Sequence, residues 1–257
     1  MQTAARTAWR WRLLAADLAM SFMWVWSSVL NKVFVHRVLG YGAHQLDGEI
    51  VRYAVSIANM FFFAFLGNAT GGGYNPLSIL GSAIAGDFSN FVFIVGARIP
   101  AQIVGSIYGV RLILNTFDGI GRGPRLNVDV AKGALTEGML TFAISSISMM
   151  LNRKVSDSFF MKTWISSLSK LTLHILGSDL TGGCMNPASV LGWAFANGEH
   201  ITKEHLVVYW LAPMEAVLLA SWVSKLMFPT KMDSDRARRK DEDGNDDGLE
   251  GKHGKLS

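Results

Sequence analysis

Six long apolar stretches, separated by short polar or glycine-rich segments, occupy most of the chain up to residue 228. A helix that crosses a bilayer needs about 20 mostly apolar residues, within a range that all six stretches meet. The pattern therefore predicts an all-α membrane protein with six transmembrane helices. The expected spans are Leu13–Phe34, Ile50–Leu66, Phe91–Leu112, Gly133–Leu151, Phe159–Leu176 and His205–Phe228.

Two further apolar segments, Asn75–Ala85 and Asn186–Ala196, are too short to cross. Each would form a helix of about 15 Å, which is half of a hydrocarbon core of about 30 Å. They belong to a repeated phrase, which reads TGGGYNPLSIL at Thr70–Leu80 and TGGCMNPASVL at Thr181–Leu191. A single Asn-Pro pair usually does no more than cap and start a helix. Two copies behind paired glycines instead indicate an internal repeat.

The repeat is expected to be inverted, because each half holds three full spans and an odd number of crossings reverses the second copy. Two half-helices entering from opposite faces would meet near the midplane. Non-helical backbone such as Gly71-Gly72-Gly73 is tolerated at that depth only when it is buried in protein or lines a water-filled cavity. The two loops therefore predict a pore or a substrate site.

Two acidic residues inside spans, Asp17 and Glu137, occupy corresponding places in the two halves. A carboxylate within a bilayer is costly unless it has partners. We expect both to be structural acids that accept hydrogen bonds from the backbone of the half-helix loops rather than to relay protons. For Asp17, a hydrated position near the cytoplasmic interface is the alternative.

The composition supports a membrane protein, since 50% of the residues are hydrophobic and only 17% are charged, against roughly a quarter in soluble proteins. The net charge of +4 comes from Lys and Arg scattered at span ends, which indicates topology charges rather than a nucleic-acid surface. These charges predict that both termini are cytoplasmic. The expected division is a cytoplasmic N-terminus at 1–12, a channel domain at 13–228 with repeats 13–114 and 133–228, and a disordered cytoplasmic tail at 229–257.

An enzyme is not expected from this sequence. Cys184 is the single cysteine, so the chain has neither an intramolecular disulfide nor a cysteine framework for a metal. The histidines show no ligand spacing, and no nucleophile stands beside a base in a recognisable arrangement. We therefore expect no catalytic residues, no metal and no cofactor.

The paired Asn-Pro boxes, together with GGCMNPASVLGWAFANG at 182–198 and YWLAP at Tyr209–Pro213, resemble the major intrinsic proteins, the aquaporin family. The altered first box and the basic pI resemble the plant small basic intrinsic proteins, in their Asn-Pro-Leu branch. The resemblance implies a right-handed bundle of six transmembrane helices and two re-entrant half-helices. It also implies a homotetramer with one pore per subunit, in the endoplasmic reticulum membrane.

The resemblance also implies the residues of the pore. The midplane would be formed by Asn75, Pro76, Leu77, Asn186, Pro187 and Ala188, and the outer selectivity filter by Ser56, His174, Gly183 and Ser189. Val55 is the alternative to Ser56, and His174 could instead be a satisfied polar residue between helices. Leu77 stands where alanine is usual and Ser189 where arginine is usual. The filter is therefore expected to be wider and less exclusive than in water-selective members.

The favoured function is a passive channel for water and other small neutral solutes, embedded in a lipid bilayer. A poorly conducting tetramer with a structural or regulatory role is one alternative, because Leu77 and Ser189 depart from the family pattern. A secondary transporter, which also uses inverted repeats and broken helices, is another.

Overall fold

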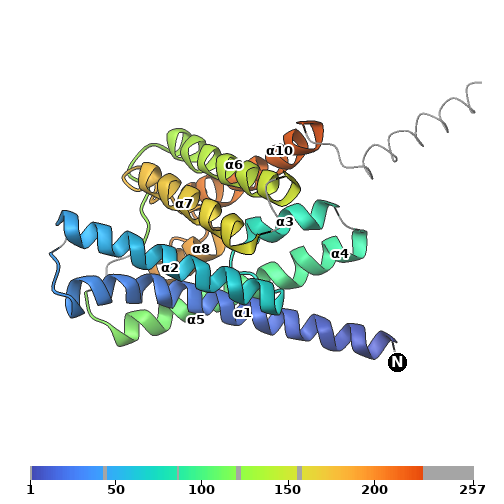
Figure 1. Cartoon of the computed structure of the whole chain (residues 1–257), viewed down its shortest axis with the longest axis horizontal. Coiled ribbons are helices and arrows are strands. Elements are labelled where there is room, and N and C mark those ends of the chain that lie inside the picture. Colours follow the sequence, from blue (N-terminus) through green and yellow to red (C-terminus); the bar gives the residue numbers. More distant parts are fainter. Residues whose placement is uncertain (1, 43–44, 86, 120–122, 155–157, 228–257) are drawn as a thin grey trace, which may run out of the picture.

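A computed structural model describes residues 2–42, 45–85, 87–119, 123–154 and 158–227. The expected end of the sixth span at Phe228 and the expected tail at 229–257 lie outside the described residues. Within them the chain is helical, with six long helical segments and two short ones (Figure 1). The long segments are α1 (Gln2–Val33, continued by a π-helical turn at Phe34–Val38), α2 (Leu46–Thr70), α4 and α5 (Phe88–Phe93 and Ile99–Thr116, joined by the π-helical turn Ile94–Arg98), α6 (Val130–Lys154), α7 (Phe159–Gly177), and α9 and α10 (Lys203–Leu206 and Ala212–Met227, joined by the π-helical turn Val207–Leu211). The short ones are the half-helices α3 (Pro76–Ala85) and α8 (Pro187–Asn197).

Among the described residues, five helical segments are long and apolar enough to cross a membrane. The fifth expected span, α7, forms a helix but is not one of these five, because Lys162, Lys170 and several hydroxyl side chains lower its hydropathy. It nevertheless packs between α2 and α6 as part of the bundle. The helix that contains the first expected span is longer than that span, since α1 begins at Gln2.

The two halves of the chain pack in the same way. In the first half α1 lies against α5, and in the second half α6 lies against α10. Each half-helix contacts a long helix of the other half, α8 against α5 and α3 against α10, and the half-helices also contact one another. Figure 1 accordingly shows α3 and α8 between the layer of α1, α2 and α5 and the layer of α6, α7 and α10. The expected pair of re-entrant half-helices is therefore present.

Proline causes the same local change in both halves. Pro100 and Pro213 have no backbone N–H, so neither can continue the regular ladder of helical hydrogen bonds. The turn before each proline is π-helical, and the N–H groups of Ile99 and Ala212 bond the carbonyls of Ile94 and Val207 five residues back. The matching turns show that the repeat extends beyond the Asn-Pro boxes.

Close helix packing explains one of the glycines in the third span. A Cβ on Gly105 would lie only 2.2 Å from the carbonyl oxygen of Leu18, so α1 and α5 can approach this closely only without a side chain there. Small residues at helix interfaces are the usual route to tight packing within a bilayer. This contact fixes α1 beside α5 and, with it, the position of Asp17.

Candidate pore

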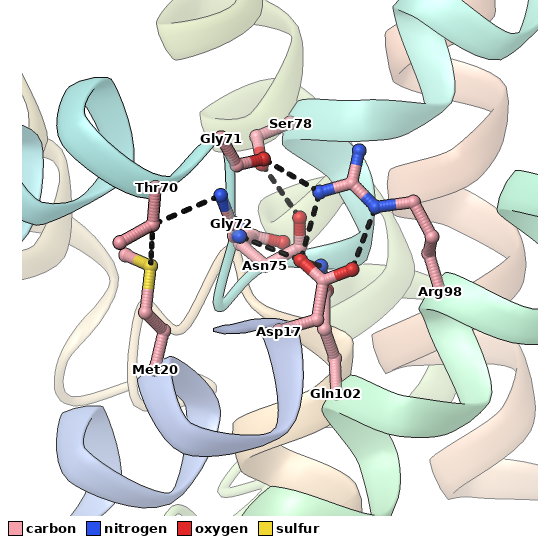
Figure 2. A network of polar contacts seen from close by, with 10 residues as sticks. Asp17, Met20, Thr70, Gly71, Gly72, Asn75, Ser78, Arg98 and Gln102 are labelled. Atoms are coloured by element: carbon pink, nitrogen blue, oxygen red, sulfur yellow. Dashed lines mark hydrogen bonds and ion pairs between the residues drawn. The ribbon is translucent and has the colours of Figure 1, made fainter. Parts of the chain in front are cut away.

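The loop before α3, residues 71–75, is called the first loop. It is held by the buried carboxylate of Asp17, which is 0% exposed. Its Oδ1 accepts a hydrogen bond of 2.6 Å from the backbone N–H of Gly73 (Figure 2). Figure 2 also shows Arg98 on the opposite side of this carboxylate. The arginine Nε donates to Oδ2 at 2.6 Å, and its Nη2 donates to Oδ1 at 2.8 Å. Asp17 therefore lies inside the protein, not in a hydrated position at the membrane interface.

Arg98 links this carboxylate to a second point of the same loop. Its Nη2 also donates to the carbonyl oxygen of Gly71 at 2.9 Å, and Gln102 Nε2 lies 3.3 Å from Asp17 Oδ1 (Figure 2). A short aspartate reaches only one loop N–H, so an arginine and a glutamine from α5 and the turn before it complete the network. The sequence did not predict this pairing, although Arg98 was a visible charge within an expected span.

The loop before α8, residues 178–186, is called the second loop. It is held by the buried carboxylate of Glu137, which is 1% exposed. Its Oε1 accepts from the Thr181 hydroxyl at 2.7 Å and from the Cys184 N–H at 2.9 Å, and its Oε2 accepts from the Met185 N–H at 2.9 Å. The extra methylene of glutamate lets it reach two consecutive backbone donors. Tyr209 then donates to the Thr181 carbonyl at 2.8 Å, so a side chain of the sixth span also bonds this loop.

The two asparagines of the boxes bond the opposite loop. Asn75 Nδ2 donates to the Met185 carbonyl at 2.7 Å, and Asn186 Nδ2 donates to the Tyr74 carbonyl at 3.1 Å. The Asn186 Oδ1 also caps α8 by accepting from the Ser189 N–H at 3.4 Å. The Asn186 Nδ2 also lies 3.3 Å from the Ser189 hydroxyl.

Met185 adopts a backbone conformation that only glycine adopts easily, with φ of 47°. This conformation directs its N–H toward Glu137 and its carbonyl toward Asn75. Strain of this kind persists only where surrounding contacts fix it, and it is concentrated at functional sites. The second loop is therefore shaped by its contacts rather than by local preference.

A cavity of about 570 Å³, which we call the outer cavity, is lined in part by residues 182–186 and Ser189 of the second box. Of the expected filter residues, Ser56, His174, Gly183 and Ser189 all line it, whereas Val55 is not among its lining residues. Asn186 also lines this cavity. Pro187 and Ala188 are buried in α8 and are absent from the lining, as are Asn75, Pro76 and Leu77 of the first box.

His174 and Gly183 are fitted closely to one another. The Nδ1 of His174 donates to the Gly183 carbonyl at 3.1 Å, which fixes the ring while its other edge faces the cavity. Gly183 has φ of +53°, and a Cβ there would lie 2.5 Å from the His174 carbonyl oxygen. A glycine is therefore required at this position by both conformation and space.

Leu77 does not narrow the cavity. It is 6% exposed and packs in a hydrophobic cluster with Leu80 and Val217, against Met214 of α10. The bulk added relative to alanine is therefore accommodated between α3 and α10, away from the lining of the outer cavity.

A second cavity of about 650 Å³, which we call the inner cavity, lies between α2, α6 and α7. Its lining shares only Met60 and Lys170 with that of the outer cavity. At this junction the rings of Trp24 and Tyr74 stack with centroids 4.2 Å apart. The ammonium of Lys170 lies 4.8 Å from the Trp24 ring centroid and 5.1 Å from that of Tyr74. Lys170 was not predicted as a site residue, although it lies one helical turn before His174 on the same helix face.

Comparison with known proteins identifies this arrangement. The sequence profile described as Major intrinsic protein matches residues 4–224, which is most of the chain. The chain belongs to the major intrinsic protein family. It is 57% identical over 232 residues to a protein of Arabidopsis thaliana named "Probable aquaporin SIP2-1", covering 90% of this chain and 98% of that protein. It is 47% identical to "Aquaporin SIP2-1" of Oryza sativa subsp. japonica, over 85% of this chain and 88% of the relative.

The fold agrees with a solved member of the family. The aquaglyceroporin from Plasmodium falciparum superposes with a TM-score of 0.68 at 16% identity, covering 86% of this chain and 98% of the other. At that identity the likeness concerns the fold alone. Membership of this channel family makes the chain an integral, multi-pass membrane protein that is not an enzyme, and its similarity to the SIP2-1 proteins confirms the predicted small basic subfamily.

Proposed function

We propose that this chain is a passive channel for water and other small neutral solutes, with one pore per subunit. The observation that supports the proposal is the outer cavity, which is lined by Ser56, His174, Gly183 and Ser189 and also by Asn186. Three polar side chains and a glycine around one cavity, beside the N-terminus of a half-helix, are suited to passing a molecule that both donates and accepts hydrogen bonds.

The half-helices supply the discrimination against cations. The N-terminal ends of α3 and α8 carry partial positive charge and meet at the crossed loops. Asn186 would offer a passing water the N–H that now faces the Ser189 hydroxyl at 3.3 Å. The barrier to cations and protons therefore depends on the partial positive charge of the two helix ends.

The filter would admit solutes larger than water. Ser189 has no cationic head group, and its hydroxyl is already in contact with Asn186. An arginine at this place would extend a fixed, strongly donating guanidinium into the cavity. Without an arginine at position 189, the width of the opening near His174 and Ser56 is set by smaller side chains.

Osmotic shrinkage of proteoliposomes, followed by stopped flow, tests this function. The purified protein should accelerate shrinkage with the low activation energy of a pore. Asn186→Asp should abolish the acceleration, because a carboxylate cannot donate to Tyr74 or to water. Lys225→Met is the matched control, since Lys225 lines neither cavity. Equal shrinkage in protein-containing and empty liposomes, with folded protein present, would contradict the proposal.

We further propose a homotetramer in the endoplasmic reticulum membrane with both termini in the cytoplasm. Glu215 supports association, because it is exposed on the single chain at the middle of the span Lys203–Met227. A carboxylate facing lipid at that depth is costly, and a neighbouring subunit would cover it. Native mass spectrometry of the protein in detergent should detect four subunits. Protease protection of a tagged C-terminus in microsomes should report the cytoplasmic side.

A second candidate is a tetramer that conducts poorly and acts through partners. The aromatic stack at Trp24 and Tyr74 favours it, because this stack and Lys170 lie where the outer and inner cavities meet. If shrinkage rates stay at the level of empty liposomes while Lys170→Ala restores flux, this second function replaces the first.

A further inference from the structure

Cationic side chains line both cavities. The outer cavity is lined by Lys32, Arg52, Arg125 and Lys170, and the inner cavity by Lys162 and Lys170. No aspartate or glutamate is among the described residues that line either one. The described lining of each cavity therefore carries lysine or arginine side chains and no carboxylate.

Few of these charges are neutralised by the protein itself. Arg52 pairs with Glu49 at the neighbouring turn of α2. The other ion pair among the described residues is Asp17 with Arg98, which lies outside the cavity linings. Lys32, Arg125 and Lys170 thus have no carboxylate partner in the part of the chain that the structure describes.

Lys170 lies where the linings of the two cavities overlap. It is the one cation that lines both cavities, so its ammonium can contact a molecule on either side. Its protein contacts are the two aromatic faces and a long 3.5 Å contact with the Tyr74 hydroxyl. An ammonium has three donors, and these contacts leave some of them available to an incoming acceptor.

The surroundings of Lys170 favour a negative ion. The positive ends of α3 and α8 meet at the crossed asparagine boxes, and Asn186 lines the same cavity as Lys170. An uncompensated cation at bilayer depth is costly, and an anion beside it removes much of that cost. Rings of Lys or Arg are the usual lining of pores that select anions.

We propose that this pore conducts small inorganic anions such as chloride or nitrate, and that Lys170 is their central binding site. The inference rests on the pore of the proposed function and extends its permeant class from neutral solutes to anions. A lysine ammonium is a compact point charge with three donors, which suits a small inorganic ion. The flexible lysine stem allows the ammonium to follow the ion from the outer to the inner cavity.

Chloride influx into proteoliposomes tests this inference. The vesicles enclose a chloride-quenched dye, and valinomycin with potassium on both sides balances the charge. The full-length protein should quench the dye faster than empty liposomes do. Lys170→Met should reduce the protein-dependent rate at least tenfold, whereas Lys170→Arg should keep it within about threefold because it keeps the charge. Lys225→Met should leave the rate unchanged, since Lys225 lines neither cavity.

Two results would overturn the inference: chloride influx no faster than in empty liposomes, or equal rates for the protein and Lys170→Met. If Lys170→Met does not fold, the reversal potential of the unmodified protein in a potassium chloride gradient decides. A sign set by chloride supports the inference, and a sign set by potassium or the absence of current overturns it. Osmotic shrinkage of the same vesicles separates the two proposals. Water flux without chloride flux refutes only this inference, and chloride flux without water flux refutes only the neutral-solute channel.

Discussion

Replacing Arg98 by methionine should destabilise the first loop far more than the loss of a surface charge would. Arg98 is 9% exposed and Asp17 is 0% exposed. The substitution removes two bonds to the carboxylate, at 2.6 and 2.8 Å, and one bond of 2.9 Å to the Gly71 carbonyl. Asp17 would remain buried, with only the Gly73 N–H and Gln102 as partners.

The magnitude follows from the cost of leaving a buried charge without its partner. Removing one member of a buried ion pair typically costs about 3–5 kcal/mol. For a chain of this size each kcal/mol lowers the melting temperature by about 2–4 °C. The expected decrease for Arg98→Met is therefore about 6–20 °C.

The assay is thermal unfolding of the purified protein in detergent, followed by circular dichroism at the helix band. Arg111→Met is the matched control, because Arg111 lies on the same helix, is exposed and contacts only the ring of Phe195 among its described partners. The control should lose no more than about 1 kcal/mol, which is the value of an exposed cation–π contact.

A double substitution separates the ion pair from other effects. Asp17→Asn in the Arg98→Met background removes the unpaired charge, so the double variant should be more stable than the sum of the single losses by about 2 kcal/mol. A decrease below 2 °C for Arg98→Met, or strict additivity in the double variant, would refute the view that this pair holds the loop.

Three further substitutions test the second loop and the outer cavity. Glu137→Gln should cost about 2–3 kcal/mol, because the amide nitrogen cannot accept from one of the three donors that now bond the carboxylate; an unchanged melting temperature would argue against this role. Gly183→Ala should lower the melting temperature well below that of Gly198→Ala, since both have positive φ but only Gly183 has an atom, at 2.5 Å, in the way of a Cβ. Ser189→Arg should reduce glycerol flux at least tenfold while sparing water flux in stopped-flow assays; equal loss of both would show that Ser189 is not at the constriction.

The sequence predicted the order of the long helices because the length and hydropathy of each apolar stretch largely determine where a helix forms. The paired Asn-Pro phrases predicted two half-helices, since each apolar run was too short to cross, and both are present as α3 and α8. The hydropathy of α7 is the weakest signal, because Lys162 and Lys170 face cavities rather than lipid. Pro100 and Pro213, in the third and sixth expected spans, are visible in the sequence and indicate an irregular helical turn before each of them.

The contacts inside the candidate site were less predictable, because they join distant parts of the chain. Arg98 and Asp17 are 81 residues apart, and no local pattern pairs them. The effect of Leu77 depended on a hydrophobic cluster with Val217 of the sixth span, which composition could not reveal. The choice between Val55 and Ser56 depended on the rotation of α2, and a one-residue step on a helix turns a side chain by about 100°.

The crossed bonds of the two asparagines have a consequence for how the chain is assembled in the membrane. Met185, whose carbonyl accepts from Asn75, is synthesised 110 residues after it. At about 5–20 residues per second, the first loop waits roughly 5 to 20 s for its partner. During that interval the Asn75 amide lacks its acceptor, the Met185 carbonyl. The Tyr74 carbonyl likewise lacks its donor, the Asn186 amide. The first half therefore reaches its final form only when the second is inserted, so biogenesis of the two halves is a single cooperative event.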